Sequence, residues 1–127
     1  MNRWKCNNFF DSLRNALNGV KEVLKNERNI RIQSVFAILA IILGILLKIH
    51  ILEFCFIIIV IFIVLICEFF NTALERAVDV FSIEYNENAK KAKDVAAAAV
   101  YMSAILSIII GILVFIPKII NILMIGE

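Results

Sequence analysis

Long runs of apolar residues constrain this chain more than any other feature. Of its 127 residues, 62% are hydrophobic, and residues 35–47, 54–67 and 95–116 contain no charged side chain. A soluble domain of this size cannot accommodate so many apolar residues, because its surface must face water. We therefore expect an integral membrane protein, and the helical spacing within and beside these runs makes it all-α.

Three membrane-spanning helices account for the runs. A helix needs about 20 apolar residues to cross a bilayer, so the first run must borrow from both flanks. Apolar side chains continue at helical spacing past Glu68, which extends the second helix beyond the bilayer. The expected segments are a first span at about 30–49, a second at about 51–81, a cytoplasmic loop at 82–94 and a third span at about 95–116. Pro117 is expected to end or kink the third span.

Residues 1–29 differ from the spans because they mix charged and apolar side chains. Apolar residues recur there at helical spacing, at Phe10, Leu13, Leu17, Val20 and Leu24, and polar residues occupy the other side. This pattern predicts an amphipathic helix that lies on the membrane surface. No internal repeat divides the chain, so we expect one domain over residues 1–127.

The distribution of positive charge predicts the orientation in the membrane. Seven Lys and Arg residues lie within residues 1–31, one lies at residue 48, four lie within 76–93 and one lies at residue 118. Positively charged flanks remain on the cytoplasmic side. We therefore expect a multi-pass protein of the plasma membrane whose N-terminus and 82–94 loop are cytoplasmic. The small net charge of +2 argues against a nucleic-acid partner.

Five polar side chains form a stripe on the second helix: Glu68, Asn71, Thr72, Glu75 and Asp79. Their spacing places them within about one quarter of the helix circumference and over roughly 16 Å of its length, about the reach of a triphosphate with its metal ions. An acidic side chain within lipid is costly, so Glu68 indicates a function. The alternative is that the stripe packs against other helices or lies among lipid headgroups.

A second polar group lies on the same side of the membrane, at Glu84, Tyr85, Asn86, Lys93 and Asp94, with Glu27 just before the first span. Carboxylate oxygens suit Mg²⁺, which shares its coordination with water and substrate phosphates. The four glycines of the chain fit neither glycine-rich nucleotide motif. A nucleotide would therefore be held by metal-bridged carboxylates, an amide and a lysine. A solvated polar loop is the alternative interpretation.

Small side chains recur every four residues along the third span, at Ala99, Ser103, Ser107 and Gly111. Such a stripe lets another helix approach closely, within one chain or between chains. Three spans can hardly enclose a polar site alone. We therefore expect a homo-oligomer.

The stripe and its surroundings resemble the signature of the prokaryotic diacylglycerol kinase family. The matching positions include Glu68, Asn71, Glu75 and Asp79, followed by Glu84-Tyr85, Ala92-Lys93-Asp94 and Ala98-Ala99-Val100. The resemblance covers nearly the whole chain. It implies a small three-span enzyme that assembles as a homotrimer, shares its sites between subunits and transfers the γ-phosphoryl group of Mg·ATP to a lipid hydroxyl.

The resemblance also implies individual roles. Glu68 would be the general base that deprotonates the lipid hydroxyl, and Glu27 and Glu75 would bind Mg²⁺. Asn71 and Asp79 would support the polar site, and the ATP contacts would be Glu84, Tyr85, Asn86, Lys93 and Asp94. Through 27–29 and Ala97 the chain is similar to the branch that phosphorylates undecaprenol, with diacylglycerol as the alternative substrate. An oligomeric ion- or proton-coupled transporter, with Glu68 as its relay, is the alternative of another class.

Overall fold

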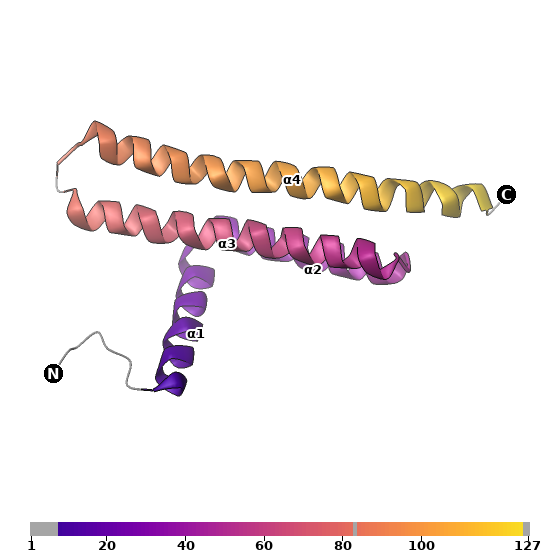
Figure 1. Ribbon diagram of the computed structural model, residues 1–127, viewed down its shortest axis with the longest axis horizontal. Helices are drawn as coiled ribbons and strands as arrows, with labels where there is room; N and C mark the ends of the chain where they lie inside the picture. Colours follow the sequence, from indigo (N-terminus) through magenta and orange to yellow (C-terminus); the bar gives the residue numbers. More distant parts are fainter. Residues whose placement is uncertain (1–7, 83, 126–127) are drawn as a thin grey trace.

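Helices are the only regular secondary structure in the residues that the computed structural model describes, 8–82 and 84–125 (Figure 1). They are α1 (Phe9–Asn26), α2 (Arg28–Leu46), α3 (Ile51–Phe81) and α4 (Glu87–Ile125). By length and composition α2, α3 and α4 could each cross a membrane. The predicted architecture, all-α with three long apolar helices after a separate N-terminal helix, is confirmed. The start of the predicted surface segment, residues 1–7, lies outside the described residues.

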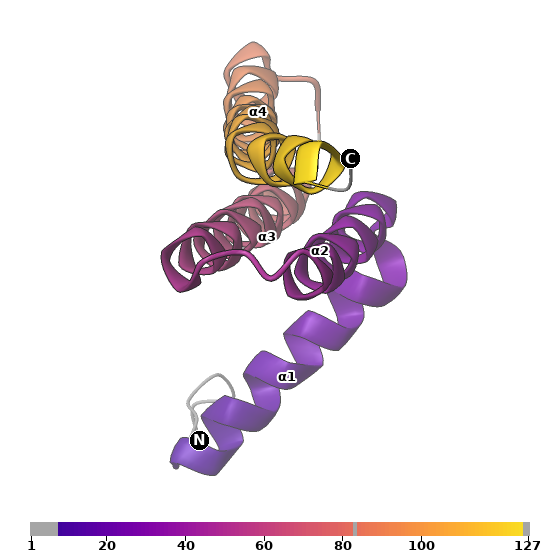
Figure 2. The same ribbon diagram turned by 90° about the vertical axis from the view of Figure 1, so that its right-hand side faces the viewer.

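The three long helices form a bundle around α3. α4 packs antiparallel along α3, and α2 packs along another side of it (Figures 1 and 2). The buried side chains of α3 follow the helical repeat on one face: Ile57, Val60, Val64, Glu68 and Thr72. α3 and α4 both extend beyond the start of α2 toward the segment that connects them (Figure 1). The polar stripe of α3 therefore continues past the end of the three-helix part of the bundle.

A single extended residue, Glu27, separates α1 from α2. α1 begins at Asn8, whose side-chain oxygen accepts a hydrogen bond of 2.8 Å from the backbone N–H of Asp11. It ends where the N–H of Glu27 donates to the carbonyl oxygen of Val23 at 2.8 Å. Because Glu27 has φ −97° and ψ 120°, the chain changes direction there. α1 consequently runs across the bundle rather than along it (Figure 2).

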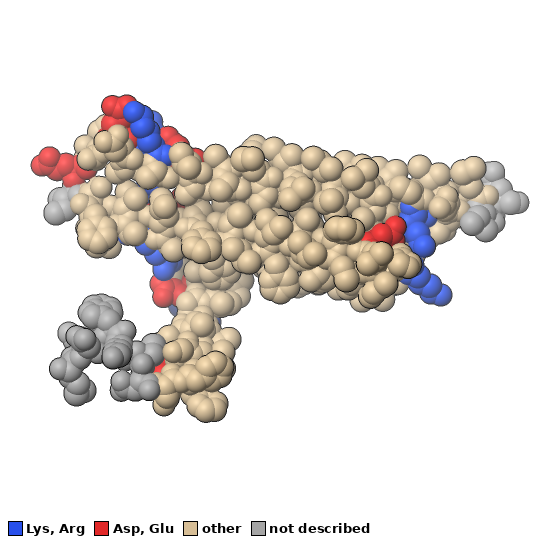
Figure 3. All heavy atoms as spheres, viewed as in Figure 1, with Lys and Arg blue, Asp and Glu red and all other residues tan. Residues whose placement is uncertain are grey.

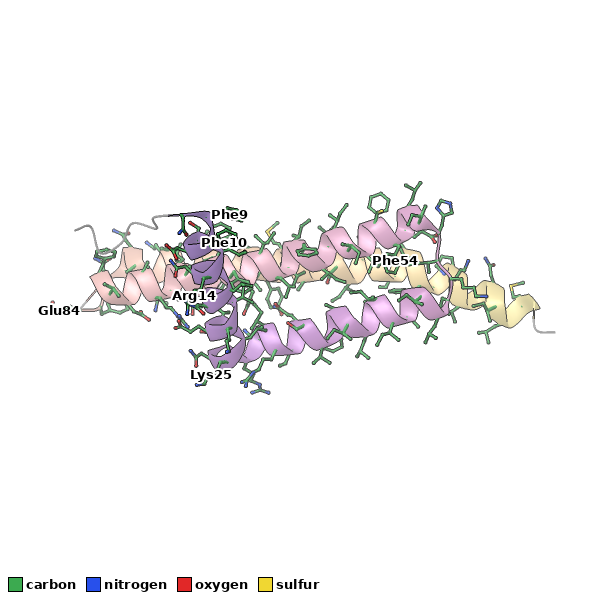
Figure 4. The ribbon with its side chains drawn as sticks, turned by 90° about the horizontal axis from the view of Figure 1, so that it is seen from below. Phe9, Phe10, Arg14, Lys25, Phe54 and Glu84 are labelled. Atoms are coloured by element: carbon green, nitrogen blue, oxygen red, sulfur yellow. The ribbon has the colours of Figure 1, made fainter. Side chains whose placement is uncertain are left out.

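The turn between α2 and α3 is a Schellman ending without the usual glycine. The N–H of Ile49 donates to the carbonyl of Gly44 at 3.2 Å, and the N–H of Lys48 donates to Ile45 at 3.1 Å. Lys48 occupies the left-handed position, with φ 48°. A Cβ on Gly44 would lie 3.0 Å from Ile49 Cδ1 and 3.2 Å from the ring of Phe54, which lies at this end of α3 (Figure 4). The missing side chain of Gly44 thus lets the turn close.

The connection between α3 and α4 is shorter than the predicted 82–94 loop, because α4 begins at Glu87. Asn86 starts the helix: its side-chain oxygen accepts hydrogen bonds from the N–H groups of Asn88 at 2.9 Å and Ala89 at 3.2 Å. Glu87 and Lys91 pair one turn apart at 2.7 Å. Alanine and lysine are good helix formers, so a polar sequence rich in both extends the apolar helix. The prediction that the whole segment is a loop is wrong for residues 87–94.

The third long helix also continues past Pro117, to Ile125. Proline removes one backbone N–H and its ring crowds the carbonyl of residue 113, which favours a kink, but its fixed φ is compatible with a helix. The residues after it are mostly apolar, and in lipid their backbone groups must bond within the helix. Of the two expectations for Pro117, an end or a kink of the helix, the end at about residue 116 is wrong.

Candidate active site

Charged side chains gather at the end of the bundle where α3 and α4 connect and around the junction of α1 with α2 (Figure 3). A smaller charged group lies toward the opposite end, and the long stretch between them shows no charged side chain on this face (Figure 3). Glu68 follows directly on the uncharged run of α3, residues 54–67. It therefore lies where the apolar part of the helix gives way to the charged end.

Glu68 is the buried acidic side chain of the site, with 3% of its surface exposed. One of its oxygens, Oε2, accepts a hydrogen bond of 3.3 Å from Nε2 of Gln33 on α2. Thr72 is buried one turn further along the same face, with 4% of its surface exposed. No salt bridge to Glu68 is found within the described part of the chain. A carboxyl group held by a neutral amide keeps its capacity to accept a proton from a substrate.

A groove of about 410 Å³ begins at Gln33, the partner of Glu68, and runs between α2, α3 and α4. On α3 its lining extends from Leu65 back to Ile57, about 12 Å of helix at 1.5 Å per residue. Its polar lining side chains are Gln33 and Ser107, and the hydroxyl of Ser107 donates to the carbonyl of Ala104 in its own helix at 2.8 Å. The groove is therefore suited to an apolar chain, and Gln33 marks its polar end.

The small side chains of α4 differ in their surroundings: one is buried, two line the groove and one is exposed. Ser103 is buried, whereas Ser107 and Gly111 are half-buried and line the groove, and Ala99 is exposed. A Cβ on Gly111 would find only Phe115 Cδ2, at 4.0 Å. The predicted stripe is thus only partly used for close helix approach within one chain, and Gly111 leaves open space instead.

Asn71 and Glu75 form a second pair on α3. Nδ2 of Asn71 donates to Oε1 of Glu75 at 3.1 Å, and both side chains are half-buried. Oδ1 of Asn71 is buried and has no hydrogen-bond partner in the structure as described. A carboxylate beside an unpartnered amide oxygen is the kind of donor set that Mg²⁺ uses together with water and phosphate oxygens. Among the described residues of one chain, no three His, Cys, Asp or Glu side chains come together as a metal site.

Glu27 lies at the junction of three helices and is paired with Arg76 of α3. The distance from Arg76 Nη2 to Glu27 Oε1 is 3.5 Å, and Nη1 of the same arginine contacts Glu22 Oε1 of α1 at 2.8 Å. Arg76 thereby connects α1 to α3 and holds Glu27 at the charged end of the bundle. Because Glu75 directly precedes Arg76 in the sequence, the predicted metal ligands Glu27 and Glu75 lie at the same end of the bundle.

Lys93 and Asp79 form an ion pair between α4 and α3. The lysine is half-buried and the aspartate is exposed. This contact brings the α4 part of the predicted nucleotide site against the polar stripe of α3. The predicted convergence of the stripe with the segment before the third span is therefore present at this position.

The remaining predicted nucleotide contacts are not brought onto the stripe within one chain. Glu84 lies at the tip of the connection between α3 and α4 (Figure 4), and Tyr85 is 81% exposed. Asp94 is exposed on α4. Within residues 8–82 and 84–125 the structure shows no ion pair or hydrogen bond of these three side chains. Asn86 uses its side-chain oxygen to cap α4, which leaves its amide nitrogen as the polar atom for a ligand.

Sequence analysis did not single out Gln33 or Arg76, the two residues that hold the acidic side chains in place. Gln33 is a polar residue only two positions before the first uncharged run, and that position was the available signal. Arg76 lies within the acidic stripe itself, between Glu75 and Asp79. In both cases the partners lie outside the residue's own helix, so the contact depends on packing that spacing along one helix does not reveal.

Fold and site together describe a multi-pass membrane protein in which a buried carboxyl group is hydrogen-bonded to a residue that lines an apolar groove, next to a charged end of the bundle. Comparison with known proteins gives the family. The profile of the family described as "Prokaryotic diacylglycerol kinase" matches residues 14–115. The chain belongs to the prokaryotic diacylglycerol kinase family.

Individual relatives agree with this membership. The chain is 38% identical over 116 residues to the undecaprenol kinase of Bacillus subtilis, which covers 91% of this chain and 94% of the relative. It is 33% identical over 124 residues to a diacylglycerol kinase of Synechocystis, covering 96% of this chain and 71% of the relative. It is 31% identical over 91 residues to the diacylglycerol kinase of Escherichia coli K12, and this match covers 72% of this chain and 75% of the relative.

Proposed function

We propose that this protein is an ATP-dependent lipid kinase that transfers the γ-phosphoryl group of Mg·ATP to the hydroxyl of undecaprenol, giving undecaprenyl phosphate. The observation that carries the proposal is the buried Glu68, which accepts a hydrogen bond from Gln33, a polar residue in the lining of an apolar groove. The similarity to the Bacillus undecaprenol kinase supports the choice of lipid. Diacylglycerol is the alternative substrate, because the other two relatives are diacylglycerol kinases.

The proposed mechanism assigns the base to Glu68. The apolar chain of the lipid occupies the groove between α2, α3 and α4, and its hydroxyl reaches Glu68 at the polar end. Glu68 accepts the hydroxyl proton as the lipid oxygen bonds to the γ-phosphorus, and the bond from phosphorus to the bridging oxygen of ADP breaks. The catalytic demand on the protein is mainly positioning and neutralisation of charge, which helix-borne side chains can provide.

Mg²⁺ would be held by Glu27 and Glu75, with Asn71 beside Glu75 as a further oxygen donor or support. Bound there, the ion would neutralise phosphate charge. The hard oxygens of these side chains fit that ion, and the unpartnered Oδ1 of Asn71 is consistent with a ligand at this position. For Glu27 to take part, its contact with Arg76 must be exchanged for the ion.

The nucleotide would lie against the exposed end of α3 and α4. Lys93 is the cation best placed for its phosphates, and Asp79 holds that lysine over the stripe. The further contacts proposed for ATP are Glu84, Tyr85, Asn86 and Asp94. Their exposure leaves them accessible to a ligand from the aqueous phase.

This arrangement requires the charged end of the bundle to face the cytoplasm, where ATP is present. The excess of Lys and Arg in the N-terminal part and in residues 76–93 supports that orientation. α1 would then lie on the inner surface of the membrane as an amphipathic helix. Its direction across the bundle supports this (Figure 2), as do its exposed apolar side chains, Phe9, Phe10, Leu13, Leu17, Val20 and Leu24.

We also propose that the enzyme is a homotrimer with sites shared between subunits. Within the described residues of one chain, the acidic side chains do not assemble into a group of three that could hold a metal ion. Asp94 and Tyr85 are exposed at the same end of the bundle and have no side-chain partner among residues 8–82 and 84–125. A neighbouring subunit would bring these groups together, as the family resemblance implies.

Parallel kinase assays test the function. Purified protein in detergent–lipid micelles is incubated with γ-labelled ATP and Mg²⁺, with undecaprenol or diacylglycerol, and the labelled lipids are separated. We expect label in undecaprenyl phosphate at a higher kcat/KM than in phosphatidic acid. The reverse ratio would assign diacylglycerol as the substrate. Label in neither lipid, together with ion transport into sealed vesicles without ATP, would support the transporter alternative.

A further inference from the structure

Gln33 is the residue that donates a hydrogen bond to the proposed base, and it lies on another helix than the polar stripe. Its Nε2 lies 3.3 Å from Glu68 Oε2, across the contact between α2 and α3. The same side chain lines the polar end of the groove. It therefore contacts both the carboxyl group and the space in which the lipid is proposed to lie.

The amide is engaged with Glu68 and with nothing else in the part of the chain that is described. Its Oε1 is buried and has no hydrogen-bond partner there. An ionised carboxylate only accepts hydrogen bonds, so the amide must present its nitrogen to Glu68 and its oxygen elsewhere. Burying an unpartnered carbonyl oxygen costs free energy, which a side chain selected for helix packing alone would avoid.

The hydrogen bond also distinguishes the two oxygens of Glu68. Oε2 is occupied by the amide, whereas Oε1 has no hydrogen-bond partner among the described residues. A neutral donor fixes the rotation of the carboxyl group without neutralising its charge, in contrast to a lysine or arginine. One oxygen is thus held and the other is left for a proton donor.

We propose that Gln33 is a positioning residue for phosphoryl transfer, which holds one oxygen of Glu68 so that the other accepts the proton of the lipid hydroxyl. This inference rests on the proposed function, since it assigns Gln33 a part in the same reaction. It concerns the turnover step rather than the binding of either substrate. Gln33 acts through Glu68 and exchanges no proton itself.

Two substitutions test the role. Gln33→Met keeps the length of the side chain and removes the donor, and Gln33→Asn keeps the amide but shortens its reach. Loss of a hydrogen bond to a charged group corresponds to a roughly ten- to hundred-fold fall in kcat, which we expect for both variants. The KM values for ATP and lipid should stay within about two-fold, because ground-state binding is not altered. Asn121→Met, which removes an exposed amide from the last part of α4, is the matched control and should retain the wild-type kcat.

A double-variant cycle separates positioning from a structural effect. In a Glu68→Gln background, Gln33→Met should cause no further fall in residual turnover, because the group it positions is already lost. Size-exclusion chromatography and thermal melting in detergent establish that each variant is assembled. Unchanged kcat in Gln33→Asn or Gln33→Met, or an additional fall in the Glu68→Gln background, would overturn the proposal. These outcomes leave the lipid-kinase function standing, whereas a wild-type protein without lipid kinase activity would overturn both.

Discussion

Glu68 and Glu87 show how differently the same side chain is used in this molecule. Glu68 is buried against α2 with a neutral amide as its partner, whereas Glu87 is exposed and pairs with Lys91 one turn away at 2.7 Å. A surface pair of this kind contributes little to stability. A buried carboxyl group beside an apolar run is costly, and its presence here, bonded to a residue of the groove lining, indicates chemistry.

Replacing Glu68 by glutamine should therefore remove activity without removing the fold. Gln fills the same volume, and its side chain can still bond Gln33, but it cannot accept the hydroxyl proton. We expect kcat for undecaprenol phosphorylation to fall at least about 100-fold, a typical contribution of general base catalysis. Glu87→Gln is the matched control and should retain most of its activity. Full turnover by Glu68→Gln, measured with labelled ATP, would rule out Glu68 as the base.

Lys48 offers a test of stability that is independent of function. It occupies the left-handed position of the Schellman ending, with φ 48°, where a side chain is unfavourable. We expect Lys48→Gly to raise the free energy of unfolding by about 1 kcal/mol, observed as a higher midpoint of thermal unfolding in detergent. Lys48→Ala keeps the Cβ and should give no comparable gain. An equal gain from alanine would mean that the lysine charge, and not the backbone, limits stability.

At the scale of the helices, α4 forms one wall of the groove, and Gly111 is part of that wall. A larger side chain at Gly111 would point into open space, since the nearest atom to a Cβ there is 4.0 Å away. We expect Gly111→Leu to narrow the groove and raise the KM for undecaprenol several-fold, as expected for lost apolar contact area, while the KM for ATP is unchanged. The measurement is initial rate against each substrate in turn.

Gly19 of α1 provides the control for that substitution. A Cβ at Gly19 has no atom within 4 Å, and the residue lies away from the groove lining. Gly19→Leu adds the same volume and should leave the lipid KM unchanged. If Gly111→Leu also left it unchanged, the lipid chain would have to lie elsewhere than in this groove.

The bounds of a helix could be predicted from the sequence where the distribution of apolar residues defines them. The extent of α3 follows from apolar periodicity, the approximate start of α2 follows from the length that a span needs, and the polar stripe from Glu68 to Asp79 follows from spacing on one helix. The start of α4 was missed because polarity was interpreted as a loop, although Asn86 is a capping residue and an alanine- and lysine-rich segment follows it. Its end could not be predicted because a proline can either end a helix or be accommodated within it, and here the helix continues.

Of the candidate site, the sequence predicts only which residues share a face of one helix. Glu68, Asn71 and Glu75 share a face by spacing, but the contacts of Glu68 with Gln33 and of Arg76 with Glu27 join different helices. Such contacts depend on how helices pack, and a hydropathy pattern specifies which face is buried without specifying its partner.

For the molecule as a whole, the charged end of the bundle exposes acidic and aromatic side chains. A neighbouring subunit could bring them together with the buried Glu68. Asp94 of α4 is exposed and unpaired among the described residues, while Glu68 of α3 is buried in the same chain. In a ring with rotational symmetry, each subunit presents one surface to one neighbour and a different surface to the other. A site built at such a contact can take Glu68 from one subunit and Asp94 from the next.

Mixed oligomers test this arrangement. Glu68→Gln and Asp94→Asn subunits, each inactive alone, are unfolded together in equal amounts and refolded into micelles. In a symmetric ring assembled at random, about one quarter of the contacts would join an intact Glu68 to an intact Asp94, and we expect activity to return to about that fraction of wild type. Separately refolded samples that are mixed afterwards are the control and should stay inactive. Mixed oligomers with no more activity than this control would mean that a single chain supplies both residues.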